Sequence, residues 1–117
     1  MSRVLVVEDE MIVAMMLEDM LTDLGHEVVE TAMRLPQAME AARTADIEIA
    51  ILDVNLDGTT SYAIAEALDA RNVPVIFASG YGSSGLEPAY RDRPTLMKPF
   101  LSSDLARAIE RTLAGAA

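Results

Sequence analysis

The sequence predicts an α/β fold: a doubly wound parallel sheet with helices on both faces. Apolar strand-like runs alternate with helix-like stretches along the chain, and three of these runs end in charged residues. Parallel strands end at one edge of their sheet, where ligands bind in open α/β sheets, so we expect a functional site at that edge. The three runs and the residues after them are Arg3–Val7 with Glu8-Asp9, Ile49–Leu52 with Asp53, and Thr95–Met97 with Lys98-Pro99.

The first half of the chain predicts two strand–helix units. Arg3–Val7 is a short apolar strand, and Met11–Leu24 is a helix that stops at Gly25. Glu27–Thr31 is a second strand, and Leu35–Ala45 is a second helix with a proline in its first turn, where proline is tolerated. The inward stripe of the first helix is expected to consist of Val13, Met16, Leu17, Met20, Leu21 and Leu24.

The second half continues the alternation but weakens it after residue 80. The expected elements are a strand at Ile47–Leu52, a helix at Ser61–Ala70, strands at Val73–Ala78 and Thr95–Met97, and a last helix from Asp104 that Ser102 or Ser103 caps. The segment Gly80–Gly85 is rich in glycine and serine, and Pro88 and Pro94 follow it. We therefore expect the fourth helix to be short, frayed, mobile or absent.

Composition limits the class of protein. At 117 residues the chain is one domain, residues 1–117, and its 51% hydrophobic content with only 4% aromatic residues predicts an aliphatic core. It has no cysteine, no run long enough for a membrane span and no signal-peptide-like start, so we expect a cytoplasmic protein without a membrane partner. Its net charge of −10 repels phosphates, so we expect no nucleic acid partner.

The residues at the strand ends suit phosphoryl transfer. The Asp53 carboxylate can attack phosphorus, provided that a cation neutralises the incoming charge. Glu8 and Asp9 are adjacent oxygen donors for Mg²⁺, and Lys98 can pair with a phosphoryl oxygen. Ser79, at the end of the fourth strand, offers a hydroxyl to another oxygen. Each residue taken alone also fits an ordinary cap, turn or solvated charge, and their conjunction on several strand ends favours the site.

Two other motifs overlap Asp53. The run Asp53–Gly58 matches the start of a calcium-binding EF-hand loop, but Ile64 stands where that loop needs its bidentate glutamate, so we reject this interpretation. The run is also similar to the Asp-x-Asp motif of haloacid-dehalogenase-type phosphatases, in which the second aspartate is the acid/base. Asn55 occupies that position here, which leaves this phosphatase class as the alternative.

At these positions the whole chain resembles the response-regulator receiver domain (CheY-like) family. Glu8-Asp9, Asp53, Ser79 and Lys98-Pro99 occur in the family's order. The resemblance implies a flavodoxin-like five-stranded sheet of order 2-1-3-4-5 and a cis candidate at Pro99. It also implies Mg²⁺ held by Asp9, Asp53, the Asn55 carbonyl and, often through water, Glu8. The phosphoryl donor would be a histidine on a sensor histidine kinase or histidine phosphotransfer protein, and the chain would be a phosphoacceptor rather than an enzyme.

The chain departs from many receivers at the switch. Thr95 stands where an aromatic residue is common, whereas the segment Phe77–Tyr81 resembles the Phe-Ala-Thr-Gly-Tyr subgroup of mostly single-domain receivers. Ser79, Tyr81 and Thr95 are therefore the candidate switch residues, with a plain loop role as the alternative for Tyr81.

Met11, Met15 and Phe100 are candidate docking residues for the histidine partner, because exposed methionines make adaptable surfaces; core packing is the alternative. The only histidine, His26, is expected to be a surface residue. The chain stops soon after the last helix, so we expect no output domain on it. Its output is then binding to an unknown downstream protein or a phosphate-sink role, unless the chain is cut from a larger protein.

Overall fold

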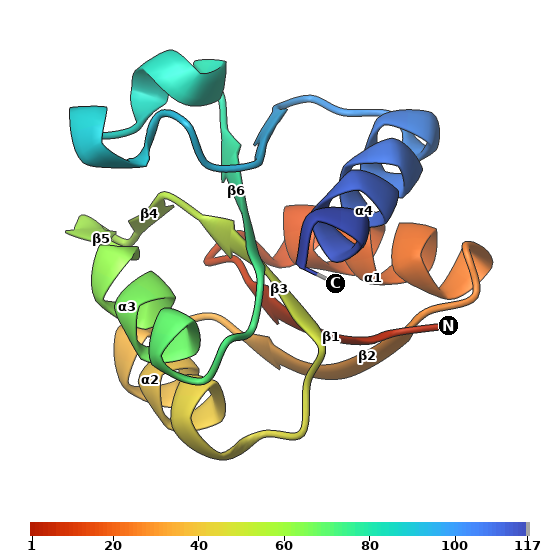
Figure 1. Cartoon of the computed structure of the whole chain (residues 1–117), viewed down its shortest axis with the longest axis horizontal. Coiled ribbons are helices and arrows are strands. Elements are labelled where there is room, and N and C mark those ends of the chain that lie inside the picture. Colours follow the sequence, from red (N-terminus) through yellow and green to blue (C-terminus); the bar gives the residue numbers. More distant parts are fainter. Residues whose placement is uncertain (117) are drawn as a thin grey trace.

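Five parallel strands form the central sheet in the order β2-β1-β3-β6-β7 (Figure 1). The computed structural model describes residues 1–116, so Ala117, the last residue of the predicted domain, lies outside the described residues. Numbered among themselves along the chain, the five strands have the order 2-1-3-4-5, which confirms the predicted topology. The strands are β1 (Arg3–Val7), β2 (Glu27–Ala32), β3 (Ile49–Asp53), β6 (Val75–Ser79) and β7 (Thr95–Met97).

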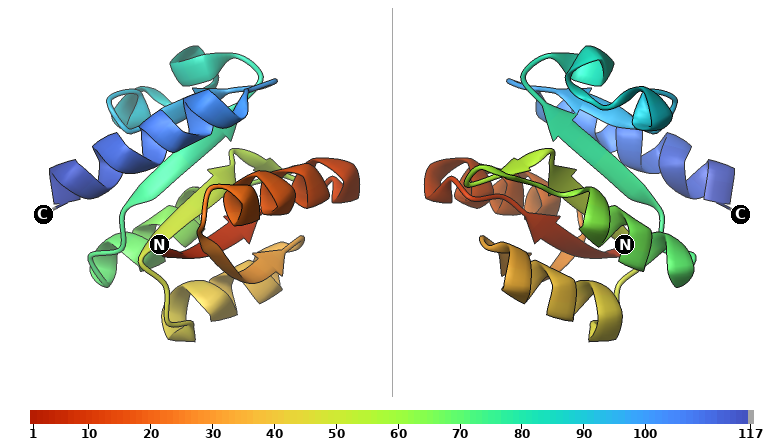
Figure 2. Two further views of the ribbon diagram at one scale, coloured as in Figure 1. Left: turned by 90° about the vertical axis from the view of Figure 1, so that its right-hand side faces the viewer. Right: turned by 90° about the vertical axis from the view of Figure 1, so that its left-hand side faces the viewer.

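Two helices cover each face of the sheet (Figures 1 and 2). On one face α1 (Met11–Asp23) and α4 (Ser102–Ala116) bury Val4 and Val6 of β1 in one apolar cluster. On the other, α2 (Leu35–Thr44) and α3 (Tyr62–Ala70) bury Leu5 and Val7 in a second cluster. Successive residues of a strand point to opposite faces, so a sheet buried on both faces requires continuous apolar strands. This is why β1, β3 and β6 were visible in the sequence as apolar runs, whereas the edge strand β2 contains two glutamates and is only partly buried.

The inward face of α1 differs from the predicted stripe. Ala14, Leu17 and Leu21 are its buried residues, whereas the Met16 side chain, predicted to point inward, is 53% exposed. The helix ends as predicted at Gly25, whose φ of 88° suits glycine. The amides of Gly25 and His26 donate to the carbonyls of Thr22 and Leu21, which is the Schellman pattern of helix termination.

The start of α4 corrects the predicted serine cap. The helix begins at Ser102, two residues before the predicted start, so neither Ser102 nor Ser103 precedes it as a cap. Instead, the Asp104 carboxylate accepts a 3.0 Å hydrogen bond from the Leu101 amide, directly before the helix. An acidic residue in the first turn also interacts favourably with the positive end of the helix dipole. The cap therefore comes from inside the first turn.

Two short segments complete the edge of the sheet. Between β6 and β7 the chain forms only the 3₁₀ turns η1 (Gly82–Gly85) and η2 (Pro88–Tyr90), in agreement with the expectation of a fourth helix that is short, frayed, mobile or absent. After β3, the hairpin β4 (Asn55–Leu56) and β5 (Thr59–Thr60) was not predicted. Its sequence signal was the Asp-Gly pair at 57–58, where both residues have positive φ, as hairpin turns favour. Within residues 1–116, no helix is long and apolar enough to span a membrane.

Candidate functional site

The charged residues at the strand ends meet at the carboxyl edge of the sheet, as the sequence predicts. Lys98 Nζ lies 2.7 Å from Glu8 Oε1 and 3.3 Å from Asp53 Oδ2, so one ammonium group bridges two carboxylates from different strand ends. The Lys98–Pro99 peptide bond is cis. The bridge joins residues 90 positions apart in the chain, a contact that only the parallel sheet creates.

Burial makes Glu8 the most perturbed group of the site. Its side chain is 3% exposed, and this burial raises its pKa from 4.5 to about 7. Hydrogen bonds from Lys98 and the Glu10 amide oppose the rise, whereas the charge of Asp53 adds to it. Burial raises the free energy of an ionised carboxyl group more than the one shared lysine lowers it.

The pKa of Lys98 is raised as well, but by its contacts and against the effect of burial. Burial alone would lower its pKa, but the Glu8 and Asp53 carboxylates raise it above the ordinary value. The ion pair therefore favours the charged lysine while Glu8 remains poorly stabilised as an anion. We attribute the difference to the number of charged partners: Lys98 contacts two carboxylates, whereas within residues 1–116 Glu8 pairs with one cation, which it shares with Asp53.

The acidic loop after β1 offers a set of oxygen donors that suits a divalent cation. Carboxylate oxygens of Glu8, Asp9 and Glu10 lie within 4.8 Å of one another. Oxygen ligands of this kind are those that Mg²⁺ prefers, and a cation would relieve the cost of ionising the buried Glu8. Sequence reasoning missed Glu10, although the signal was present in the run of three acidic residues.

Asp9 also joins this loop to the hairpin after β3. Its Oδ2 atom accepts a 2.9 Å hydrogen bond from the Asp57 amide. Burial raises the pKa of Asp9, but this hydrogen bond and those with Glu8 and Asp53 outweigh burial and hold the pKa below its ordinary value. Asp9 is therefore ionised at neutral pH and ready to bind a cation. The predicted ligand role of the Asn55 carbonyl, in β4 of the same hairpin, stays a prediction.

Ser79 and Tyr81 interact through the backbone, not through the tyrosine ring. Ser79 ends β6 and is 6% exposed, and its Oγ accepts a 3.1 Å hydrogen bond from the Tyr81 amide. The Tyr81 side chain is 78% exposed. Thr95 is half-buried on β7 and donates its hydroxyl to the Arg93 carbonyl at 2.9 Å. Ser79 thus ends β6 and Thr95 begins the neighbouring β7, and the hydroxyl groups of these two residues have different partners.

The side chains of the candidate docking residues differ in their solvent exposure. Met11 and Met15 are 64% and 56% exposed, and Ile12 between them is exposed as well. Phe100 is half-buried and packs against the cluster beneath α1 and α4, which is the packing alternative for this residue. His26, expected at the surface, is half-buried, and its Nδ1 accepts a 3.1 Å hydrogen bond from the Ser2 amide.

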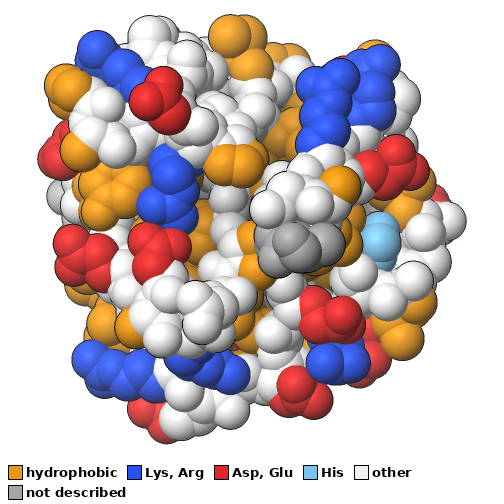
Figure 3. Space-filling view, viewed as in Figure 1, with side chains coloured by type: hydrophobic (Ala, Val, Ile, Leu, Met, Phe, Trp, Pro, Cys, Tyr) orange, Lys and Arg blue, Asp and Glu red, His pale blue; other side chains and the backbone are white. Residues whose placement is uncertain are grey.

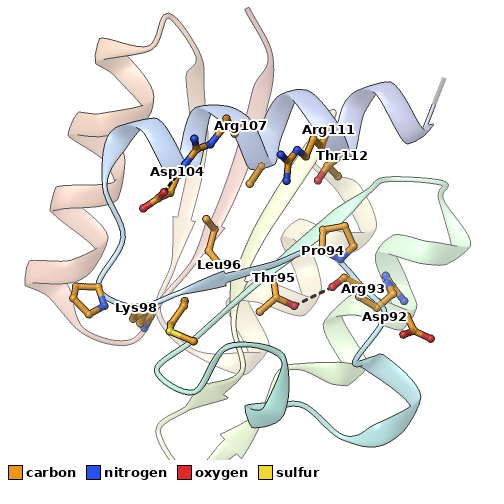
Figure 4. A pocket seen from close by; sticks show the side chains of 13 residues that line it. Asp92, Arg93, Pro94, Thr95, Leu96, Lys98, Asp104, Arg107, Arg111 and Thr112 are labelled. Carbon is orange, nitrogen blue, oxygen red and sulfur yellow. Dashed lines mark hydrogen bonds and ion pairs between the residues drawn. The ribbon is translucent and has the colours of Figure 1, made fainter.

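A groove of about 720 Å³ lies between β7 and α4, beside the site and not within it (Figure 4). Lys98 lies at one end of it, and Arg93 and Pro94 lie at the other (Figure 4). Arg107 and Arg111 of α4 line its outer side, and basic side chains gather over α4 in the space-filling view (Figure 3). None of the acidic strand-end residues lines this groove, so the candidate site is the open sheet edge and not this cavity.

Comparison with known proteins matches the chain to one family. The model of the response regulator receiver domain matches residues 4–110. The transcriptional regulatory protein PdtaR of Mycobacterium tuberculosis is 34% identical over 114 residues, which cover 92% of this chain and 55% of PdtaR. The phyllosphere-induced regulator PhyR of Methylorubrum extorquens is 32% identical over 120 residues, which cover 96% of this chain and 43% of PhyR. The chain thus spans about half the length of the curated relatives it matches.

A solved structure agrees over almost the whole chain. The solution structure of SdrG from Sphingomonas melonis Fr1 is 41% identical, with a TM-score of 0.86, and the match covers 97% of both chains. The two chains are therefore similar in sequence as well as in fold.

Proposed function

The chain belongs to the response regulator receiver domain family, and we propose that it accepts a phosphoryl group on Asp53 and transmits the change by altered partner binding. The observation that carries this proposal is the position of Asp53. It ends a buried strand at the sheet edge, 3.3 Å from Lys98 Nζ and beside the acidic loop of Glu8 and Asp9. A nucleophile, a fixed cation and metal-binding oxygens therefore occupy one edge.

The chemical step is a transfer between two nucleophiles. One Asp53 carboxylate oxygen forms a bond to phosphorus while the bond between phosphorus and the donor histidine nitrogen breaks. The histidine nitrogen keeps the electron pair of the broken bond and, if the other ring nitrogen carries no proton, takes up a proton from water. Asp53 becomes an acyl phosphate. Lys98, freed from Asp53, pairs with a phosphoryl oxygen, and Ser79 Oγ donates to another. Bound Mg²⁺, held by Glu8, Asp9, Asp53 and the Asn55 carbonyl, would neutralise charge on the transferred group.

The same residues argue for a phosphoacceptor and against a multiple-turnover phosphatase. A haloacid-dehalogenase-type phosphatase needs a second aspartate as acid/base two residues after the nucleophile. Asn55 stands there and cannot transfer a proton. We therefore propose a receiver that assists its own phosphorylation and dephosphorylation but is not an enzyme.

We propose that the phosphoryl donor is the histidine of a sensor histidine kinase or histidine phosphotransfer protein. The exposed apolar side chains of Met11, Ile12 and Met15 directly follow the acidic loop, so a partner that contacts them brings its histidine to the edge that holds Asp53. A cytoplasmic location belongs to the same proposal, because the ATP that charges such donors is found there. Replacing Met15 with aspartate should slow transfer from a phosphohistidine donor and leave phosphorylation by acetyl phosphate unchanged; equal loss with both donors would contradict the docking role.

The test of the central proposal is phosphorylation by a small donor. The protein is incubated with Mg²⁺ and acetyl phosphate, and its intact mass is measured. We expect one added phosphoryl group on the wild type and on Asp57→Asn, but none on Asp53→Asn. Asp57 is a matched control, because it lies exposed in the adjacent hairpin and the same atoms change. A modified Asp53→Asn protein, or phosphate release without an adduct, would refute the proposal.

The lifetime of the adduct separates two kinds of output. An acyl phosphate that persists while a downstream protein binds supports a signalling switch. An adduct that decays quickly, with no change in the surface around η1, supports a phosphate sink. Both can be followed by intact mass over time, together with amide chemical shifts of residues 80–90.

A further inference from the structure

The turn η1 folds back over the end of β6 and covers the Ser79 side chain. Ser79 Oγ accepts the Tyr81 amide proton at 3.1 Å, and the Ser79 carbonyl accepts the Lys98 amide proton at 2.9 Å. The turn is itself closed by Ser84, whose hydroxyl donates to the Tyr81 carbonyl at 2.6 Å. The hydroxyl that the proposed function assigns to a phosphoryl oxygen is thus already engaged by this turn.

Gly85 is the point where the turn contacts this hydroxyl. A Cβ atom at Gly85 would overlap Ser79 Oγ and would lie 3.3 Å from Tyr81 Cβ and 3.4 Å from Ser79 Cβ. Gly85 is not among the glycines with positive φ, so its backbone does not require glycine. The requirement is space: the backbone of the turn lies directly against Ser79. Gly80, in contrast, has no atom within 4 Å of a Cβ placed on it.

We propose that Gly85 is a positioning residue: by lacking a side chain it lets η1 close over Ser79 and hold that hydroxyl on the Tyr81 amide until Asp53 is phosphorylated. The proposal rests on the proposed function and assigns a further residue to it. When Ser79 Oγ turns to a phosphoryl oxygen, the Tyr81 amide loses its acceptor and the closed turn loses one of its two side-chain hydrogen bonds. The turn then opens.

Opening of the turn changes a surface of the molecule. Tyr81 and Met97 are 78% and 60% exposed, and the Met97 side chain lies against Gly82, where a Cβ atom would come within 2.8 Å of Met97 Cε. Both side chains therefore move with η1. A partner that contacts them would distinguish the closed turn from the open one.

The first test needs no phosphorylation. Hydrogen exchange of the Tyr81 amide is measured by NMR in the wild type, Gly85→Ala and Gly80→Ala. Overpacking of this kind shifts the equilibrium between the closed and the open turn by about fivefold or more toward the open turn. We therefore expect the Tyr81 amide to exchange at least about fivefold faster in Gly85→Ala than in the wild type. Gly80→Ala should match the wild type. An unchanged Tyr81 amide in Gly85→Ala would overturn the proposal.

The second test measures the direction of coupling. Beryllofluoride, an analogue of the phosphoryl group, is titrated in the presence of Mg²⁺. If the closed turn restrains Ser79, loosening it increases the fraction of molecules ready to bind, and Gly85→Ala should bind about fivefold more tightly. Ser84→Ala, which removes a turn-closing bond at an exposed position, should shift affinity in the same direction. Unchanged or weaker binding by both variants would overturn the proposal, because a purely structural glycine predicts that result.

The two tests also separate this inference from the function on which it rests. If the wild type does not bind beryllofluoride, the proposed role of Asp53 fails, whereas Tyr81 exchange still decides whether Gly85 holds the turn closed. If Gly85→Ala folds poorly, Ser84→Ala supplies the affinity measurement. Thermal unfolding of Gly85→Ala in a Ser79→Ala background then identifies the overlap: the loss of stability should shrink when Oγ is absent, and an equal loss would contradict the contact.

Discussion

Replacing Glu8 with glutamine is expected to make the protein more stable at and above neutral pH. The Glu8 pKa rises from 4.5 to about 7 on folding, because its carboxyl group is buried. The folded state therefore binds more protons than the unfolded state between these two values. Stability that is fully present below about pH 4.5 is lost as the pH rises through about 7. Glutamine carries no charge at any of these pH values and should avoid this loss.

The magnitude follows from the two pKa values. At 1.36 kcal/mol for each pKa unit, the difference between 4.5 and about 7 corresponds to about 3 kcal/mol. We expect the unfolding free energy of Glu8→Gln to equal that of the wild type at about pH 4.5 and to exceed it by about 3 kcal/mol above pH 7. Removing one charge from an exposed surface position usually changes stability by less than about 0.5 kcal/mol, so the effect is distinct.

The assay is urea unfolding of both proteins, without divalent cations, in steps from about pH 4.5 to 8.5. Glu10→Gln is the matched control, because it makes the same chemical change at an exposed position in the same loop. The difference between Glu8→Gln and the wild type should grow with pH, and the Glu10→Gln difference should stay small. A Glu8→Gln difference that is constant with pH, or a less stable variant above pH 7, would refute the reasoning that burial outweighs the contact with Lys98.

Three further outcomes test other parts of the structure. Burial and the nearby N-terminal amine lower the pKa of His26, so its contribution to stability is lost as the pH falls below its ordinary value of 6.5; His26→Asn should flatten this slope in urea unfolding measured between about pH 5 and 8, and an unchanged slope would exclude His26 as its source. Gly25→Ala should cost about 1 kcal/mol, because φ is 88° there, and a neutral change in thermal unfolding would contradict a required left-handed residue. Ile109→Ala, at a 2% exposed core position of α4, should lower the free energy of unfolding by about 2–5 kcal/mol, whereas Met16→Ala on α1 should lower it by less than about 0.5 kcal/mol. A loss for Met16→Ala as large as that for Ile109→Ala would show that the inward face of α1 is wrongly assigned.

The elements that sequence reasoning located share one property: their signals are local. β1 and β3 were visible because both faces of a parallel sheet are buried, so the first charged residue marks the strand end. Gly25 was visible because only glycine readily takes the left-handed conformation after α1. The weak segment after β6 was visible because its glycines and prolines cannot sustain a helix.

The misjudged features depend on neighbours that are distant in the chain or on competing local signals. Met16 fits the apolar spacing of α1, but its position relative to the sheet leaves it exposed. At α4, the two serines suggested a serine cap, but the helix begins at Ser102 and the Leu101 amide donates to the Asp104 carboxylate. The hairpin after β3 carried an Asp-Gly signal, yet its two-residue strands were too short to show alternation.

The amino-acid sequence alone showed which chemical groups are available: a carboxylate nucleophile, oxygen donors, a lysine and a hydroxyl, each at or directly after the end of a strand. It could do so because strand ends are local features and parallel strands end at one edge. How these groups act on one another depends on the packing of the folded chain. Parallel pairing brings Lys98 against both Glu8 and Asp53, and the packed chain buries Glu8 enough to raise its pKa. The fold of η1 likewise places Gly85 on the Ser79 hydroxyl. Distances and burial are properties of the packed chain, and no local pattern contains them.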